Sequence, residues 1–385
     1  MTWDDVDTLP DLDPRTNTGS YLGTSRHTDA QSIRRYFGIR EFDPGVFDYP
    51  PVIPGTFLKA PDNSAFSAAG GTDALIEGPM GAGKSTFLKL LSVHLMDEAA
   101  SFPSEAVVWR GSESRSEWVS FAPWAKVCLP ASCTVSARVV STSEGDAYTR
   151  EVDLEDVVRE VVYYDDPLDL CQNHLESGKF HVVYPDPQMT GCQDLYERSP
   201  KRKDGLEFTS SDPVNHWWVA FLLARVEHGP YTWTSLLVDE VGDIIPQSAS
   251  KDQYASYQKV ELYRDLFIDS RKYKLSVYHA GQNTEDAHEK VKRKHRWRAT
   301  LNGRANPTRA SQVVGVNRVP MNTDLTSAMP TGRGLLWTET NFEAFGWPDI
   351  PKPTSEELRL SLSPKVPSDP ADAGPRSEPE GGVPS

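Results

Sequence analysis

Cysteine is scarce in this chain, and no long apolar run is present. Four cysteines in 385 residues, without the paired spacing of a zinc site, exclude a disulfide scaffold and favour reduced, buried thiols. The longest apolar run, residues 217–224, is far too short to span a bilayer. The opening residues, MTWDDVDTLPDLD, lack the apolar core of a secretion signal. We therefore expect no direct insertion into a membrane and a cytoplasmic location in a prokaryotic host.

Positive charge is also in short supply. The 55 acidic residues exceed the 40 basic ones and give a net charge of −15. This balance excludes a uniformly cationic nucleic-acid binder, so any contact with DNA requires a local basic patch. The acidic surplus, together with an excess of Arg over Lys, suits a salt-adapted or a high-GC source. With 38% hydrophobic and 10% aromatic residues, the chain can bury a sizeable core.

The texture of the sequence changes twice along the chain. Residues 1–70 are rich in Asp, Pro, Gly, Ser and Thr and indicate an extended N-terminal arm. Residues 71–350 have a globular texture, with a polar, irregular insertion at about 113–175 in which 134–140 is expected to form an edge strand. No aromatic residue follows Trp347, and residues 351–385 are expected to form a disordered tail rich in Pro and acidic residues.

Short apolar strands and helical segments alternate within residues 71–350. The predicted strands include 73–77, 106–109, 180–185, 234–240 and 275–280, and helices are expected at 87–96, 212–228 and 252–273. Such alternation is typical of an α/β fold with a mostly parallel sheet flanked by helices. We interpret Trp217 and Trp218, which lie at helical spacing beside an apolar segment, as core residues.

A complete phosphate-binding motif follows the first of these strands. Residues 78–85, GPMGAGKS, match G-x-x-x-x-G-K-[ST] and are followed by a helix. The loop's backbone N–H groups and the helix dipole would cradle phosphates, Lys84 would contact the β- and γ-phosphates, and Ser85 would bind Mg²⁺. ATP and Mg²⁺ are therefore the expected cofactors. The residues expected to bind the nucleotide are Gly78, Pro79, Met80, Gly81, Ala82, Gly83, Lys84, Ser85 and Thr86.

An acidic pair ends a second apolar strand, LLVDE. In a P-loop enzyme such a pair forms the other half of the site: Asp239 would hold Mg²⁺, and Glu240 would polarise the attacking water. Asp243 is a weaker candidate for the base. The long separation between Lys84 and Asp239 disfavours small nucleotide kinases. The sequence lacks an LSGGQ-like signature and the NKxD motif, which disfavours ABC cassettes and favours ATP over GTP.

The segments after LLVDE resemble those of the FtsK/HerA superfamily of P-loop ATPases, including the DNA-packaging and virion-associated ATPases of archaeal viruses and plasmids. A helix and an Arg-containing turn lead into a strand that ends at Gln282, and a glycine turn and a strand close the domain. The resemblance covers about residues 71–350 and implies a RecA-like P-loop NTPase core. The DNA-orienting winged helix and the membrane anchor of FtsK are not recognisable here.

The resemblance also implies roles for further residues. Gln282 would sense the γ-phosphate, and Arg271 or Arg304 would be a finger that reaches a neighbouring subunit's nucleotide. Such fingers imply self-association as a ring, expected to be a hexamer. The implied activity is a motor that moves or packages double-stranded DNA for a virus or mobile element, with virion or portal proteins as possible partners and a virion-associated location.

Two alternatives to a DNA motor stay open at this stage. One is an assembly ATPase of the zonula-occludens-toxin-like type that acts on proteins, and the other is a virion component that binds nucleotide with little turnover. The densest basic run, 290–298 (KVKRKHRWR), is either a tracker of the DNA backbone or a solvated surface.

Overall fold

The computed structural model describes residues 57, 71–96, 104–141, 147–303, 329–338, 342–347 and 356–365. Most of the predicted N-terminal arm, and the end of the predicted tail from residue 366 onward, therefore lie outside the described residues. In the described part of the chain, no helix is long and apolar enough to cross a membrane.

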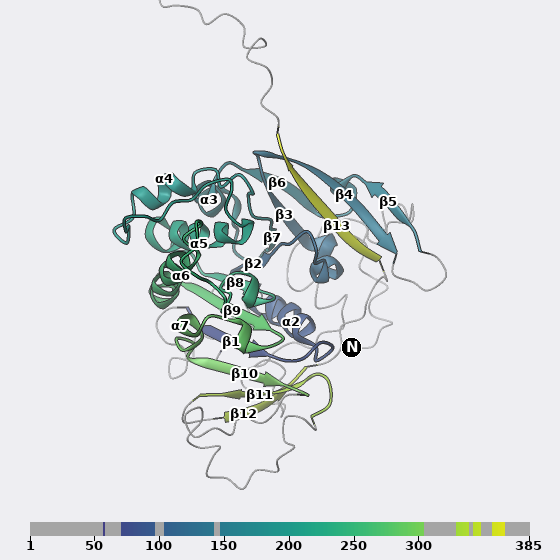
Figure 1. The fold of residues 1–385 in the computed structure, drawn as a ribbon. Helices are drawn as coiled ribbons and strands as arrows, with labels where there is room; N and C mark the ends of the chain where they lie inside the picture. Colours follow the sequence, from purple (N-terminus) through teal and green to yellow (C-terminus); the bar gives the residue numbers. More distant parts are fainter. Residues whose placement is uncertain are drawn as a thin grey trace, which may run out of the picture.

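A large, mostly parallel sheet forms the centre of the molecule (Figure 1). Its strands are β1 (Asp73–Glu77), β2 (Ala106–Arg110), β3 (Ala125–Pro130), β6 (Glu160–Tyr164), β7 (Phe180–Val183), β8 (Thr234–Val238), β9 (Leu275–Gly281), β10 (Trp297–Leu301), β11 (Arg333–Trp337) and β12 (Phe342–Gly346). They lie in the order β12-β11-β10-β1-β9-β8-β2-β7-β3-β6. The pairs that β11 makes with β10 and with β12 are antiparallel, and the other pairs are parallel.

Helices cover both faces of this sheet. The helices are α2 (Lys84–Met96), α3 (Pro167–Asp169), α4 (Cys192–Glu197), α5 (Trp217–Leu223), α6 (Ser256–Ser270) and α7 (Glu289–Lys292). Because successive side chains of a strand point to opposite faces, each central strand contributes side chains to two hydrophobic cores, one on each face of the sheet. In β8, for example, Leu237 packs in the cluster that contains α2, whereas Leu236 packs in the cluster that contains α5 and α6.

This architecture confirms the predicted α/β fold with a RecA-like P-loop core. Strand β9 lies between β1, which precedes the phosphate loop, and β8, which precedes the acidic pair. Trp217 and Trp218 are fully buried in the core, as predicted. The four cysteines are buried and free.

The region expected to be an irregular insertion is more regular than its sequence suggests. Strands β3 and β6 extend the main sheet, and the 3-10 helix η4 (Glu117–Trp124) packs beside them. Strand β4 (Cys133–Ser141) was expected to be an edge strand but is the central strand of a second sheet, between β13 (Glu356–Pro364) and β5 (Thr149–Val152).

Strand β13 corrects the expected start of the disordered tail. Residues 356–364 pair with β4 along its whole length in an antiparallel register. The segment alternates apolar and polar residues, and Leu358 and Leu360 are buried in the core that also contains β4. A composition rich in Pro, Ser and Glu hides this short period-two pattern.

Candidate functional site

The candidate site lies where four parallel strands end. The phosphate loop follows β1, the acidic pair follows β8, Gln282 follows β9 and Arg110 ends β2. Because these strands are parallel neighbours, their carboxyl ends meet at one edge of the sheet, which is where open α/β sheets bind ligands. The strand order, rather than proximity in sequence, therefore brings these residues together.

The phosphate loop has the backbone shape that a phosphate cradle needs. Gly81 and Gly83 have φ angles of 80° and 90°, a region that residues with a β-carbon rarely adopt. A β-carbon at Gly83 would also lie 3.2 Å from the indole of Trp347. Ala82 is buried and Met80 is exposed at the tip of the loop. Helix α2 begins at Lys84 and points its positive end at the loop.

The side chain of Lys84 lies inside this loop. Its ammonium donates hydrogen bonds to the carbonyl oxygens of Gly78 (2.8 Å) and Pro79 (3.1 Å), and the residue is 8% exposed. A buried ammonium needs oxygen partners, and phosphate oxygens would be stronger partners than carbonyls because they carry charge. Lys84 is thus placed to bind the phosphates of a nucleotide.

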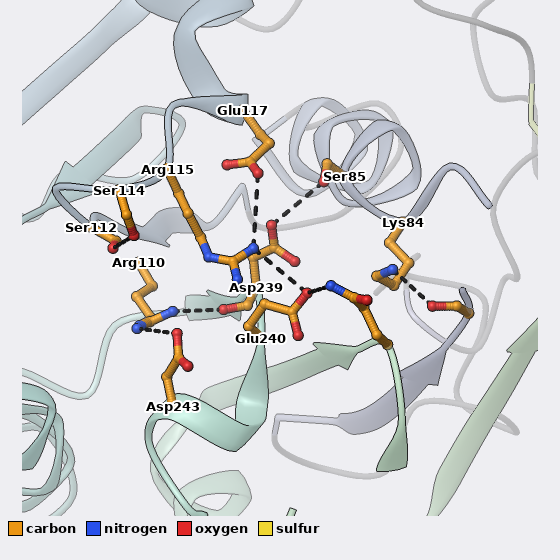
Figure 2. Close-up of polar contacts among 12 residues, drawn as sticks. Lys84, Ser85, Arg110, Ser112, Ser114, Arg115, Glu117, Asp239, Glu240 and Asp243 are labelled. Carbon is orange, nitrogen blue, oxygen red and sulfur yellow. Dashed lines mark hydrogen bonds and ion pairs between the residues drawn. The ribbon is translucent and has the colours of Figure 1, made fainter. Parts of the chain in front are cut away.

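Ser85 and Asp239, on facing elements, place two oxygen atoms of the kind that Mg²⁺ binds close together. The Ser85 hydroxyl, at the start of α2, lies 3.5 Å from Oδ2 of Asp239, which follows β8 (Figure 2). Burial, followed by the negative charge of Glu117, raises the pKa of Asp239 to about 6, and the nearby Arg115 opposes this rise. Burial disfavours the charged form of this carboxylate, and a bound cation would stabilise it. The hydroxyl of Ser85 and the carboxylate of Asp239 are the kind of hard oxygen ligand that Mg²⁺ requires.

Glu240 turns toward the same edge of the sheet. Its backbone is left-handed, with φ 58° and ψ 75°, a conformation that costs a residue with a β-carbon about 1 kcal/mol or more. Its carboxylate accepts a hydrogen bond of 3.0 Å from the side-chain amide of Gln282. The structure therefore brings Glu240 and Gln282, which were predicted as base and γ-phosphate sensor, into direct contact.

Arg110 anchors the turn that carries the acidic pair. This buried side chain donates to the backbone oxygen of Asp239 (2.7 Å), to the carboxylate of Asp243 (2.9 Å) and to the side chain of Asn215 (3.2 Å). Asp243, the weaker candidate for the base, is therefore engaged by Arg110 and has a side chain that is 42% exposed. Glu240, which bonds to Gln282 at the end of β9, therefore stays the stronger candidate for the base.

Arg110, Arg115 and Glu117 lie at this edge of the sheet but are not among the residues predicted from the sequence. The side chain of Arg115 lies 3.5 Å from Glu240 and 3.9 Å from Glu117 (Figure 2). Arg110 could have been found, because a polar residue at the end of a buried parallel strand belongs to the ligand-binding edge. Arg115 and Glu117 follow in a polar loop and a 3-10 helix, and no local pattern marks them.

Of the two predicted finger residues, only Arg271 is described, and it does not join this site. Arg271 is exposed and lies before β9, at the amino end of that strand. Seven residues of β9, roughly 20 Å of extended chain, separate it from Gln282. Arg304 lies outside the described residues. The role of either residue toward a neighbouring subunit stays a prediction.

The basic run at 290–298 is largely engaged within the chain. Lys290 pairs with Glu261 (2.5 Å), Lys292 with Glu285 and Glu289 (3.1 and 2.9 Å), Arg293 with Glu289, and Arg296 with Asp73 (2.7 Å). His295 is buried, and its Nε2 lies 2.7 Å from Nδ1 of His279. The acidic neighbours of the run therefore neutralise most of its charge, and its role as a tracker of the DNA backbone or as a solvated surface stays a prediction.

No protein-family model and no curated protein matches the sequence. Among solved structures, the genome packaging NTPase B204 from Sulfolobus turreted icosahedral virus 2 in complex with ATP-gammaS is 11% identical, with a TM-score of 0.36 over 72% of this chain and 98% of that chain. VirB4 of Thermoanaerobacter pseudethanolicus is 14% identical, with a TM-score of 0.42 over 73% and 90%. The pCW3 conjugation coupling protein TcpA with ATPgS is 13% identical, with a TM-score of 0.33 over 76% and 70%.

At these identities the likeness concerns the fold and transfers no activity. It agrees with what the strand order and the phosphate loop already show within this chain. The strand order and the phosphate loop give this chain the fold of a RecA-like P-loop NTPase, as the sequence predicts.

Proposed function

We propose that this protein hydrolyses ATP at the edge of the sheet formed by the ends of β1, β8 and β9. The observation that carries the proposal is the convergence of Lys84, Ser85, Asp239 and Glu240, which come from two distant parts of the sequence. Lys84 binds the β- and γ-phosphates, and Ser85 and Asp239 hold Mg²⁺, which neutralises phosphate charge. Glu240 polarises the attacking water, and Gln282 orients the carboxylate of Glu240.

The energy of hydrolysis is proposed to drive the movement of double-stranded DNA by a ring of subunits. Support comes from the resemblance of residues 71–350 to FtsK/HerA ATPases and from the descriptions of the similar structures as a genome packaging NTPase and a conjugation coupling protein. The specific cargo, as in packaging for a virus or transfer of a mobile element, belongs to this proposal.

A second candidate function is the movement or assembly of proteins. The ion pairs between residues 290–298 and acidic residues elsewhere in the chain favour this alternative, because they neutralise most of the positive charge that would follow a DNA backbone. The net charge of −15 acts in the same direction, since an acidic body repels DNA outside any local basic surface.

The two functions are distinguished by ATP turnover measured with and without duplex DNA, at low and at high salt. A DNA motor is expected to turn over ATP faster with duplex DNA, and the stimulation should weaken as salt rises, because phosphate contacts release counterions. Turnover that is present but indifferent to duplex DNA at every salt concentration would contradict the DNA motor and favour a protein substrate.

A further inference from the structure

The guanidinium of Arg115 lies between two carboxylates that come from different elements. Nη1 is 3.5 Å from Oε1 of Glu240 and 3.9 Å from Oε1 of Glu117 (Figure 2). The same oxygen of Glu240 accepts the hydrogen bond from Gln282. The carboxylate proposed to polarise water is thus held on one atom by two side chains, one of which is a cation.

The backbone around Arg115 is anchored, but its side chain is not enclosed. The N–H of Gly111 donates to the carbonyl of Val183 (2.8 Å), and Glu113 accepts a bond of 2.8 Å from the N–H of Leu362 in β13. The side chain of Arg115 is 30% exposed. The loop therefore holds the long side chain at the rim of the site and leaves it room to change partners.

Through its contact with Glu240, Arg115 adjoins the edge of the sheet where we propose that the terminal phosphate of a nucleotide binds. Lys84 and Ser85 approach this place from α2, and Asp239 and Glu240 approach it from β8. The planar guanidinium of an arginine binds phosphate oxygens in a bidentate manner, whereas the ammonium of a lysine acts as a point charge.

We propose that Arg115 is a sensor of the γ-phosphate within its own subunit, which exchanges its pair with Glu240 for a pair with the γ-phosphate when ATP binds. The exchange places a positive charge on the phosphate and releases Glu240 to contact the attacking water. ADP offers no γ-phosphate, so the pair between Arg115 and Glu240 persists with ADP. This inference rests on the proposed ATPase function. It assigns a role to a residue outside the phosphate loop and the acidic pair of Asp239 and Glu240.

The test is a double-mutant cycle read by nucleotide affinity. The dissociation constants of ATPγS and ADP, each with Mg²⁺, are measured for the wild type, Arg115→Ala, Glu240→Gln and the double variant. Arg115→Ala should weaken ATPγS binding by about tenfold or more and leave ADP binding unchanged, because a charged contact to the γ-phosphate is lost. Glu240→Gln should tighten ATPγS binding by about two- to fivefold, since the ion pair no longer has to break. This gain should vanish in the double variant.

Two further variants separate sensing from a structural role. Arg115→Lys should restore part of the preference for ATPγS over ADP, because it keeps the charge but loses the fork of donors. Arg138→Ala, on β4, is the matched control: its side chain is 55% exposed beside Glu151, and its loss should change neither affinity.

Three outcomes would overturn the inference. The first is that Arg115→Ala leaves ATPγS binding unchanged, and the second is that it weakens the binding of ATPγS and ADP equally. The third is that Glu240→Gln tightens ATPγS binding even when Arg115 is replaced by alanine. Each of these outcomes, in a wild type that binds and hydrolyses ATP, contradicts the sensor and leaves the proposed ATPase intact. A wild type that binds neither nucleotide contradicts the ATPase itself, and the sensor with it.

Discussion

At the scale of single residues, the site contains a buried carboxylate, Asp239, and a buried ammonium, Lys84. Asp239 is 5% exposed, and the ammonium of Lys84 is bonded to the carbonyl oxygens of Gly78 and Pro79 in the loop. Both charges are costly to bury without strong partners. Their arrangement therefore predicts measurable effects on stability as well as on activity.

The first prediction concerns Asp239 and pH. Its pKa of about 6 exceeds the usual value of 3.8, so the folded protein binds this proton more tightly than the unfolded chain does. The associated stabilisation is complete below about pH 4 and is lost as pH rises through about 6. Asp239→Asn should therefore raise the free energy of unfolding at pH 8, without metal, by at most about 3 kcal/mol.

Denaturant unfolding at pH 4 and pH 8 checks this prediction. The stabilising effect of Asp239→Asn should be present at pH 8 and close to zero at pH 4. An equal effect at the two pH values would show that burial does not penalise the charged form of this carboxylate.

The second prediction separates Glu240 from Asp243. Glu240→Gln should bind ATP yet hydrolyse it about 10²–10⁴ times more slowly, because the amide keeps the size of the side chain but cannot act as a base. Asp243→Asn should keep more of the turnover, since Asp243 bonds to Arg110 and its side chain is 42% exposed. Turnover rates of the two variants decide the assignment, and a crippled Asp243→Asn beside a mild Glu240→Gln would reverse it.

At the scale of elements, α7 and the residues after it are bound to the rest of the molecule by ion pairs. Lys292 has a side chain that is 10% exposed and pairs with Glu285 and Glu289, whereas Lys294 is exposed. Lys292→Glu places three carboxylates together and should lower the free energy of unfolding by about 1–3 kcal/mol. Lys294→Glu, the matched control, should change it by less than about 0.5 kcal/mol.

The same two variants bear on DNA binding. If the segment contacts DNA, Lys294→Glu should reduce the slope of log affinity for duplex DNA against log salt concentration by roughly 0.9 without unfolding the protein.

The stability comparison has its own contradicting outcome. Equal loss of unfolding free energy in Lys292→Glu and Lys294→Glu would argue that the ion pairs of Lys292 do not stabilise the segment.

Strand β13 is the other element that carries a prediction. Leu360 is fully buried and faces the core, whereas its neighbour Arg359 has a side chain that is 58% exposed. Leu360→Ala should lower the free energy of unfolding by about 2–5 kcal/mol, and Arg359→Ala should change it by less than about 0.5 kcal/mol. Denaturant titration measures both. Similarly small effects from the two variants would mean that β13 does not pack on β4.

At the scale of the whole molecule, local patterns predict part of the architecture. The conformation of residues 78–85 can be predicted from the local sequence, because the glycines and the lysine have fixed positions in the phosphate-binding motif. The strand at 234–238 is apolar enough to be predicted as buried, and the two acids after it mark its end. These local signals were sufficient to predict the α/β fold and the position of the phosphate loop.

Other features depend on tertiary structure and escape a local pattern. Strands β3 and β6 are short segments in a polar region, and they become recognisable through their pairing at the edge of the main sheet. Arg115 reaches Glu240 because β2 and β8 are parallel neighbours, which no spacing in the sequence reveals. The charge of the basic run cannot be judged from the run alone, because Asp73 and Glu261, which pair with Arg296 and Lys290, are remote in sequence.

The most direct test of the central claim is ATP turnover by the wild type and by Lys84→Ala with Mg²⁺. The wild type should hydrolyse ATP, and Lys84→Ala should reduce turnover to background while keeping a cooperative unfolding transition and the circular dichroism of the wild type. Loss of the ammonium removes the contact to the β- and γ-phosphates and leaves two carbonyls free to bond with water. Undiminished turnover in a folded Lys84→Ala protein would contradict the account, because hydrolysis would then occur without the phosphate loop.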